Sequence, residues 1–147
     1  MGTGQYWYNG LENSMRSFLK DINKSMTISL TFNMDGLPIY NSSKYQFWPI
    51  LAASESLQPF VVAIYYGISK PILQEYLYPF VTEINNIIRD GIKINNHLIR
   101  IYIKCFVCDT PARCFKMIDK HCGLFKYCLL HLMRTVPIMF CFVRTIK

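Results

Sequence analysis

Two aspartates that end two stretches of apolar alternation are the residues of this sequence best suited to chemistry. Asp35 follows "MTISLTFNM" (26–34), and Asp109 follows "LIRIYIKCFVC" (98–108). Each precedes a proline-containing turn, "DGLP" in the first case and "DTPAR" in the second. Two carboxylates at neighbouring strand ends repel each other unless a cation lies between them. Mg²⁺ or Mn²⁺ suits that role, because both ions prefer hard oxygen ligands and accept a phosphate in the same shell.

Each aspartate also has a purely structural interpretation. An Asp before Gly-x-Pro commonly forms a turn, and an Asp before Thr-Pro commonly caps a helix. At the level of the residues alone, both interpretations of Asp35 and Asp109 therefore stay open.

The order of the elements decides whether the two acids can meet. Period-two alternation and short apolar runs predict strands at 26–34, 47–54, 60–67 and 98–109. Apolar steps of three and four residues predict helices at 10–25, 69–91 and 110–121. After the first helix, the order is β-β-β-α-β-α, which is an α/β chain with a mixed sheet. A fourth strand parallel to the first would place Asp35 and Asp109 side by side.

Two details of these elements are open to a structural test. In the fourth strand we expect one face to carry Ile99, Ile101, Ile103, Cys105 and Val107, and the other Arg100, Tyr102 and Lys104. Pro79 lies inside the long helix and is expected to kink or split it, because proline lacks the amide hydrogen and its ring meets the preceding turn.

Composition limits the class of protein. The 147 residues suit one ordinary domain, and 52% hydrophobic against 17% charged residues excludes a disordered tail. The net charge of +7 favours an anionic partner, although basic residues that only keep an apolar chain soluble explain it equally well. No signal peptide is recognisable, and Cys122–Arg144 is too interrupted by charges and a proline for a membrane span. We therefore expect an intracellular chain.

The six cysteines are interpreted as free thiols or metal ligands rather than disulfides. Cys105 and Cys108 form a C-x₂-C, but residues three apart on a strand face opposite sides, which disfavours a zinc site there. A tetrahedral zinc site is conceivable farther on, and its ligands would come from Cys114, His121, Cys122, Cys128 and His131. The weak spacing makes zinc a secondary hypothesis.

Four stretches of the sequence resemble a known protein family in their residues as well as in their periodicity. They are "MDGLPIYNSSKYQFWPILA" (34–52), "PFVVAIYYGISKP" (59–71), "YPFVTEINNIIRDGIKI" (78–94) and "IRIYIKCFVCDTPARCFKMI" (99–118). In motif and spacing they resemble the catalytic region of CACTA (En/Spm)-type transposases and related transposon-derived proteins. The resemblance covers roughly residues 5–122 and divides the chain into a helical lead-in (1–25), a partial RNase H-like catalytic domain (26–122) and a divergent, irregular tail (123–147).

The resemblance implies a DDE/D transposase that cuts and joins DNA in the nucleus with two Mg²⁺ or Mn²⁺ ions. Asp35 falls on the first catalytic acid and Asp109 on the second, and both would hold metal. Arg113 either contacts phosphate or is an ordinary surface helix residue, and Trp48 is expected in the core. The partner would be DNA, no membrane is implied, and a homo-oligomer is left open.

The chain departs from the family after the "DTPAR" helix. Where the family has "GH-x-G…GC-x-x-C", a zinc-binding knuckle, this sequence keeps His121 but has C-x₂-H at Cys128 and His131. No position matches the family's third acid, and a shifted reading frame or mis-spliced exon would explain the divergent tail. We therefore expect little or no catalysis from this chain alone. The alternatives are a non-enzymatic remnant that binds DNA or protein, and a gene-prediction fragment without function.

Overall fold

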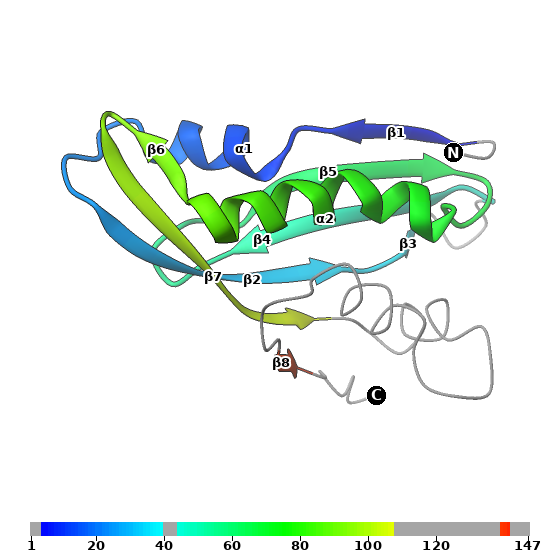
Figure 1. Ribbon diagram of the computed structural model, residues 1–147. Helices are drawn as coiled ribbons and strands as arrows, with labels where there is room; N and C mark the ends of the chain where they lie inside the picture. The colour runs from blue at the N-terminus through cyan, green and yellow to red at the C-terminus, as the bar shows by residue number, and fades with distance from the viewer. Residues whose placement is uncertain (1–3, 40–43, 108–138, 142–147) are drawn as a thin grey trace.

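The computed structural model describes residues 4–39, 44–107 and 139–141, which form one mixed β-sheet with a long helix across one face (Figure 1). The strands are β1 (Gln5–Tyr8), β2 (Met26–Met34), β3 (Leu37–Pro38), β4 (Gln46–Ala53), β5 (Phe60–Gly67), β6 (Ile92–Ile94), β7 (His97–Val107) and β8 (Met139–Cys141). The helices are α1 (Leu11–Phe18) and α2 (Leu73–Asp90). The α/β class predicted from the sequence is confirmed.

The sheet runs in the order β1-β5-β4-β2-β7-β6, with β3 beside β4 and β8 beside β7. β2, β4 and β5 form an antiparallel meander, and α2 then carries the chain across to β7, which is parallel to β2. The predicted order β-β-β-α-β is therefore confirmed. The last predicted helix, 110–121, lies outside the described residues. Strands β1, β3, β6 and β8 were not predicted, because short strands carry little periodic signal.

β2 and β7 are adjacent parallel strands inside the sheet, and their sequences explain the pairing. On β2, Ile28, Leu30 and Phe32 are fully or almost fully buried, while the hydrophilic residues between them face the other side of the sheet. On β7, Ile99, Ile101 and Ile103 repeat the pattern in parallel register. Matching apolar faces on adjacent strands fix the register, because a slip of one residue would expose every apolar side chain.

The predicted faces of β7 are wrong beyond Ile103. Leu30 pairs with Ile103 but Thr31 pairs with Cys105, so Lys104 is an extra residue in a β-bulge. A bulge shifts the alternation by one residue. Phe106 consequently lies on the helix face, and Cys105 and Val107 lie on the opposite face with Thr31 and Asn33.

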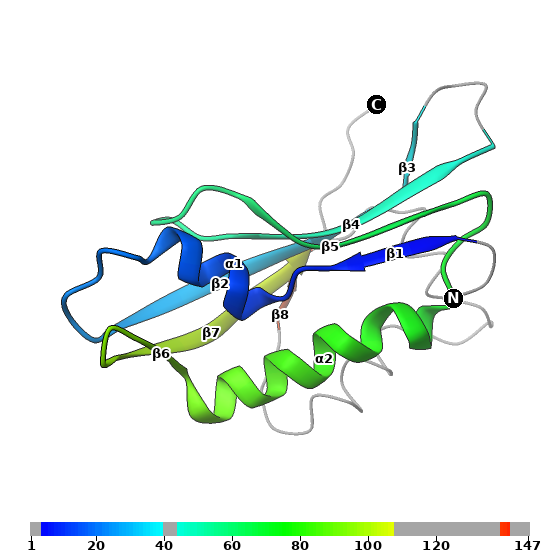
Figure 2. The same cartoon turned by 90° about the horizontal axis from the view of Figure 1, so that it is seen from above.

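α2 lies across one face of the sheet (Figure 2). One apolar stripe of the helix is buried. The Phe32 and Phe80 ring centroids are 5.0 Å apart and the Phe32 and Phe106 centroids 5.5 Å, which makes an aromatic centre of the core. Pro79 does not split the helix, which is continuous through it. The helix ends at Gly91, whose positive φ of 72° is a conformation that side chains with a Cβ rarely adopt.

The N-terminal segment joins the same sheet. β1 pairs antiparallel with β5, and α1 follows it along the edge of the sheet. α1 has no side-chain cap of its own at Gly10. Instead the Glu83 carboxylate on α2 accepts the amides of Leu11 (2.7 Å) and Glu12 (3.1 Å), together with the Tyr8 hydroxyl. A residue far along the chain therefore stabilises the start of this helix.

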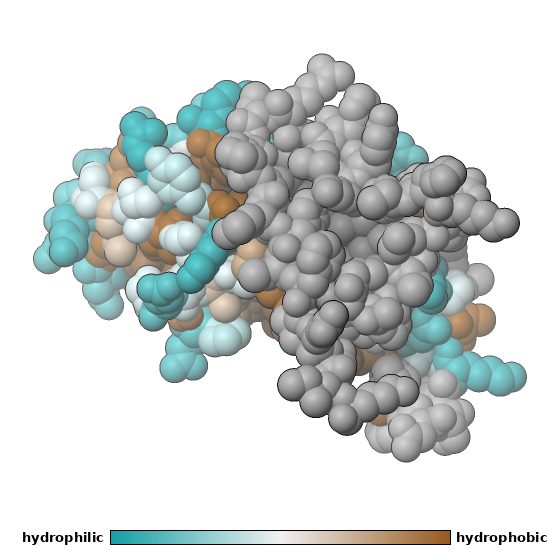
Figure 3. Space-filling view, turned by 90° about the horizontal axis from the view of Figure 1, so that it is seen from below, coloured by the Kyte–Doolittle hydropathy of each residue, from teal (hydrophilic) through white to brown (hydrophobic). Residues whose placement is uncertain are grey.

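The surface at one end of the molecule is hydrophilic. Seen from below, the end where β6 turns into β7 carries mainly hydrophilic side chains at its rim (Figure 3). Lys93, Asn95 and Asn96 are exposed there, and the two asparagines take the positive φ values that the tight turn requires. Neither described helix combines the length and apolarity needed to cross a membrane.

Candidate functional site

Asp35 lies directly after β2, the central strand, at the point where the chain leaves its pairing with β4. Met34 still pairs with Ile50, and the chain rejoins β4 at Leu37 as β3. Asp35 is half-buried, and its Oδ1 atom is shielded from solvent. Asp35 therefore lies in a two-residue link, with a paired strand directly before it and another directly after it in the sequence.

Gly36 lets the chain pass over a buried tryptophan immediately after the acid. A Cβ on Gly36 would lie 2.4 Å from the Cζ2 atom of Trp48, closer than real Cβ contacts allow. Trp48 is 5% exposed, so its prediction as a core residue is confirmed, and its Nε1 donates to Gln46 Oε1 at 3.1 Å. The Tyr76 hydroxyl on α2 donates to the Trp48 carbonyl at 3.2 Å. The Asp-Gly pair is therefore packed against the core through Trp48.

The other predicted site residues lie outside the described residues. These are Asp109, Arg113, His121, Cys128 and His131, together with Cys108, Cys114 and Cys122. The last described pair of the β2–β7 register is Asn33 with Val107. Asp35 and Asp109 each follow that pair by two residues in the sequence.

The described residues contain no cluster of three or more His, Cys, Asp and Glu side chains that could enclose a metal ion. Asp35 contributes hard oxygen atoms, which suit Mg²⁺ or Mn²⁺ rather than zinc. Cys105 is buried, and its Sγ lies 3.7 Å from Thr31 Oγ1, so it is a packed thiol on the face opposite α2. Of the predicted metal ligands, Asp35 alone lies within the described residues, and its role as a ligand stays a prediction.

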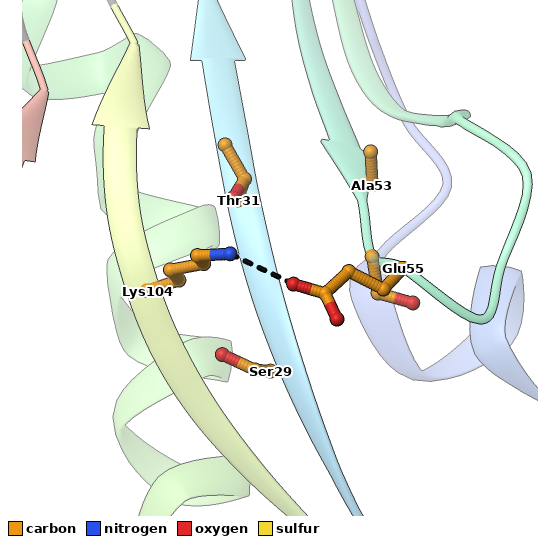
Figure 4. A pocket seen from close by; sticks show the side chains of 6 residues that line it. Ser29, Thr31, Ala53, Glu55 and Lys104 are labelled. Atoms are coloured by element: carbon orange, nitrogen blue, oxygen red, sulfur yellow. Dashed lines mark hydrogen bonds and ion pairs between the residues drawn. The ribbon is translucent and has the colours of Figure 1, made fainter.

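The face opposite α2 also carries a polar hollow that the sequence did not predict. It has a volume of about 210 Å³ and is lined by Ser29, Thr31, Ala53, Ser54, Glu55 and Lys104 (Figure 4). Lys104 extends over β2 toward Glu55, and Nζ lies 2.9 Å from Oε1. This hydrogen bond and the lysine charge lower the pKa of the Glu55 carboxyl. Lys104, which lines the hollow, is also the extra residue of the β-bulge, and local alternation in the sequence does not predict that bulge.

Comparisons with known proteins give no match: no family model fits the chain, and no curated protein or solved structure is significantly similar to it.

Proposed function

We propose that this chain is a transposon-derived module, built on a partial RNase H-like domain, whose partner is DNA. The strand arrangement supports the proposal. β5, β4 and β2 form a meander, and β7 returns beside β2 in the parallel sense after a crossover helix. That order is the one expected for the catalytic domain that the sequence resembles. The net charge of +7 fits a nucleic-acid partner, and a nuclear location belongs to the same proposal.

The observation that carries the proposal is the position of Asp35 at the end of the central strand. Its carboxylate follows β2 directly, with Oδ1 withdrawn from solvent. Asn33 and Val107 are register partners, and Asp35 and Asp109 lie at equal sequence distance beyond them. The proposal extends this parallel register by two residues, which would bring both carboxylates to one edge of the sheet.

Such a pair has a definite chemical role. Two aspartates at one strand edge supply hard, anionic oxygen ligands for Mg²⁺ or Mn²⁺, and the bound ion relieves their mutual repulsion. In DNA-cutting enzymes, ions held in this way activate the attacking water and stabilise the leaving oxygen of a phosphodiester. Asp35 and Asp109 would hold the ion and the DNA phosphate would complete its shell.

We do not expect strand cleavage by this chain alone. No position of the sequence matches the third acid of the family, so one ion would lack a protein ligand. The proposed activity is metal-assisted binding of DNA phosphate without turnover. Supercoiled plasmid incubated with the chain and Mn²⁺ should stay intact, and nicking that disappears in the Asp35→Ala variant would overturn this part of the proposal.

Metal binding by the full chain tests the carboxylate pair. The chain is titrated with Mn²⁺, and binding is monitored by the loss of the electron paramagnetic resonance signal of the free ion. We expect one site, whose affinity for Mn²⁺ falls by at least about tenfold in Asp35→Asn. Asp109→Asn should have a similar effect. Asp90→Asn is the matched control, because Asp90 is exposed at the end of α2 and paired with Arg89 at 2.7 Å. Equal Mn²⁺ affinity in the wild-type and Asp35→Asn chains would contradict the proposal.

The second candidate is a remnant that binds DNA through its basic surface without any metal. The net charge of +7 favours this alternative as much as it favours the first. Affinity for duplex DNA in EDTA that falls steeply with salt, with no dependence on Asp35, would select the second candidate. A chain that shows no cooperative unfolding transition would instead support a fragment without function.

A further inference from the structure

The face of the sheet opposite α2 carries three exposed aromatic side chains on its β1–β5–β4 half. Trp7 on β1 is 51% exposed, Tyr66 on β5 is 37% exposed, and Tyr45, just before β4, is 45% exposed. The Tyr45 and Tyr66 rings are parallel to within 3°, with centroids 5.1 Å apart. Trp7, Tyr45 and Tyr66 are called the aromatic surface below.

Strand alternation places these residues on one face. Tyr6 and Tyr8 on β1 contact α2 through Tyr76 and Glu83, so Trp7 between them faces the other way. Tyr65 is fully buried, and Tyr66 therefore lies opposite to it.

Register then brings the three aromatics close together. Trp7 pairs with Ile64, and Gln5 pairs with Tyr66, so Trp7 and Tyr66 are diagonal neighbours on β1 and β5. Tyr66 pairs with Phe47 on β4, which in turn pairs with Leu37 on β3. Through Phe47, the aromatic surface therefore neighbours β3, the strand that begins two residues after Asp35.

The charges around the aromatic surface favour an anionic ligand. Lys44 precedes Tyr45 and Lys70 follows the end of β5, and both are exposed. Farther along the same face lie Arg100 and Lys104, while the nearby Glu55 is paired with Lys104. Between 37% and 51% of each of the three aromatic residues stays exposed, and a cluster of exposed aromatic rings beside lysines is typical of a binding surface.

We propose that the aromatic surface binds single-stranded DNA by stacking its bases on Trp7, Tyr45 and Tyr66, with Lys44 and Lys70 near the phosphates. Every base has a flat π-face, so stacking of this kind is tolerant of sequence and needs an unpaired strand. The inference rests on the proposed function for the identity of the partner as DNA. It adds which strand form is held, where it is held, and that the binding needs no metal.

Tryptophan fluorescence measures this binding directly. Trp7 is exposed and Trp48 is buried, so a stacked base should quench Trp7 and leave Trp48 unchanged. The full chain is titrated with oligo(dT) of about 12 nucleotides in EDTA. We expect quenching that Trp7→Phe abolishes, while the remaining Trp48 emission reports that the fold is intact.

The fluorescence anisotropy of labelled oligo(dT) measures the affinity of each variant and so identifies the side chains that bind DNA. Tyr45→Ala and Tyr66→Ala should each weaken binding about tenfold, and Tyr66→Phe should retain it because the ring remains. Tyr78→Ala is the matched control, since Tyr78 is 62% exposed but lies on α2 and belongs to the other side of the molecule. Circular dichroism of each variant checks that folding is unchanged.

Several results would overturn the inference. Equal losses for Tyr66→Ala and Tyr78→Ala would show non-specific binding, and tighter binding of duplex DNA or of RNA would identify a different ligand. A change of oligomeric state in Tyr66→Ala, without a change in DNA affinity, would assign the surface to a second copy of the chain. Since the titration is done in EDTA and the Mn²⁺ titration without DNA, failure of this inference is distinguishable from failure of the carboxylate pair.

Discussion

At the scale of the residue, the Asp35–Gly36 pair is the most constrained feature of the candidate site. Asp35 stands at the end of the central strand, and Gly36 lies against the Trp48 ring without room for a Cβ. A glycine is needed at position 36 because the backbone passes close to the Trp48 ring, and not because of an unusual φ. The acid and the core are thereby coupled, because any displacement of Trp48 also displaces the backbone that carries the carboxylate.

Gly36→Ala tests this coupling. The added methyl would meet the buried indole, and we expect the free energy of unfolding to fall by about 1–3 kcal/mol. Urea denaturation followed by fluorescence measures the change. The double variant Gly36→Ala/Trp48→Phe supplies the check. Because the smaller ring leaves room for the methyl group, the double variant should lose less free energy of unfolding than the two single variants lose together. Equal losses would show that contact with Trp48 is not the cause.

At the scale of the element, α1 depends on α2 for its first turn. Its N-cap residue, Gly10, has no side chain to offer, and a Cβ there would approach Glu83 Oε1 to 3.0 Å. The Glu83 carboxylate accepts two of the helix amides and the Tyr8 hydroxyl. An acidic group at a helix N-terminus is favourable both as an acceptor and as a negative charge against the helix dipole.

Glu83→Gln should therefore weaken the attachment of α1. The amide keeps the size of the side chain but removes the charge and replaces one acceptor by a donor. We expect a loss of about 1–3 kcal/mol in the free energy of unfolding and faster amide exchange at Leu11 and Glu12. Glu12→Gln is the control, because the Glu12 side chain is 43% exposed and, among the described side-chain contacts, bonds Arg16 on its own helix. Similar exchange rates in both variants would contradict the role of Glu83.

At the scale of the whole molecule, the sheet is asymmetric. One face is covered by α2 and holds the aromatic centre of the core (Figures 1 and 2). The other face carries the polar hollow, the ion pair of Lys104 with Glu55, and the aromatic surface. The core therefore lies on the face covered by α2, and the proposed DNA-binding residues lie on the opposite face. On the covered face also lie two half-buried tyrosines, Tyr6 and Tyr8, whose ionisation links global stability to pH.

Alkaline conditions should destabilise the protein. Burial raises the pKa of Tyr6 and Tyr8 well above the ordinary value of about 10, and the bond to Glu83 and its charge raise that of Tyr8 further. Below pH 10 both hydroxyls are neutral in the folded and unfolded chains, so their stabilising contribution is complete. Above pH 10 the unfolded chain loses these protons first, and the free energy of unfolding falls as pH rises.

Urea denaturation between pH 8 and pH 11, combined with tyrosinate absorbance, measures this dependence. The variant Tyr6→Phe/Tyr8→Phe should be less stable at neutral pH, because it loses the bonds to the Tyr76 carbonyl and to Glu83. Its stability should decline less steeply above pH 10. A decline as steep as that of the wild-type chain would assign the pH dependence to other groups.

Local periodicity was sufficient to predict the elements that carry the fold. The strands at 26–34 and 60–67 were predicted with the bounds that the structure gives, and the fourth strand and the long helix to within a few residues. Their alternation or helical stripe is written in consecutive residues, so no tertiary information is needed. The same patterns predicted Asp35 at the end of a strand, and this position is confirmed, as is the expectation that Trp48, a residue of the resembling motif, lies in the core. The roles of Asp35 and Asp109 remain predictions.

Only the tertiary structure decided the features that depend on distant pairing. The bulge at Lys104 arises from register with β2, and it reversed the predicted faces of Cys105 and Val107. The capping of α1 by Glu83 joins residues more than seventy positions apart. The aromatic surface exists because β5 pairs with β1 on one side and with β4 on the other. Sequence fixes which residues alternate along one strand, whereas the neighbours across strands are chosen by packing of the whole sheet.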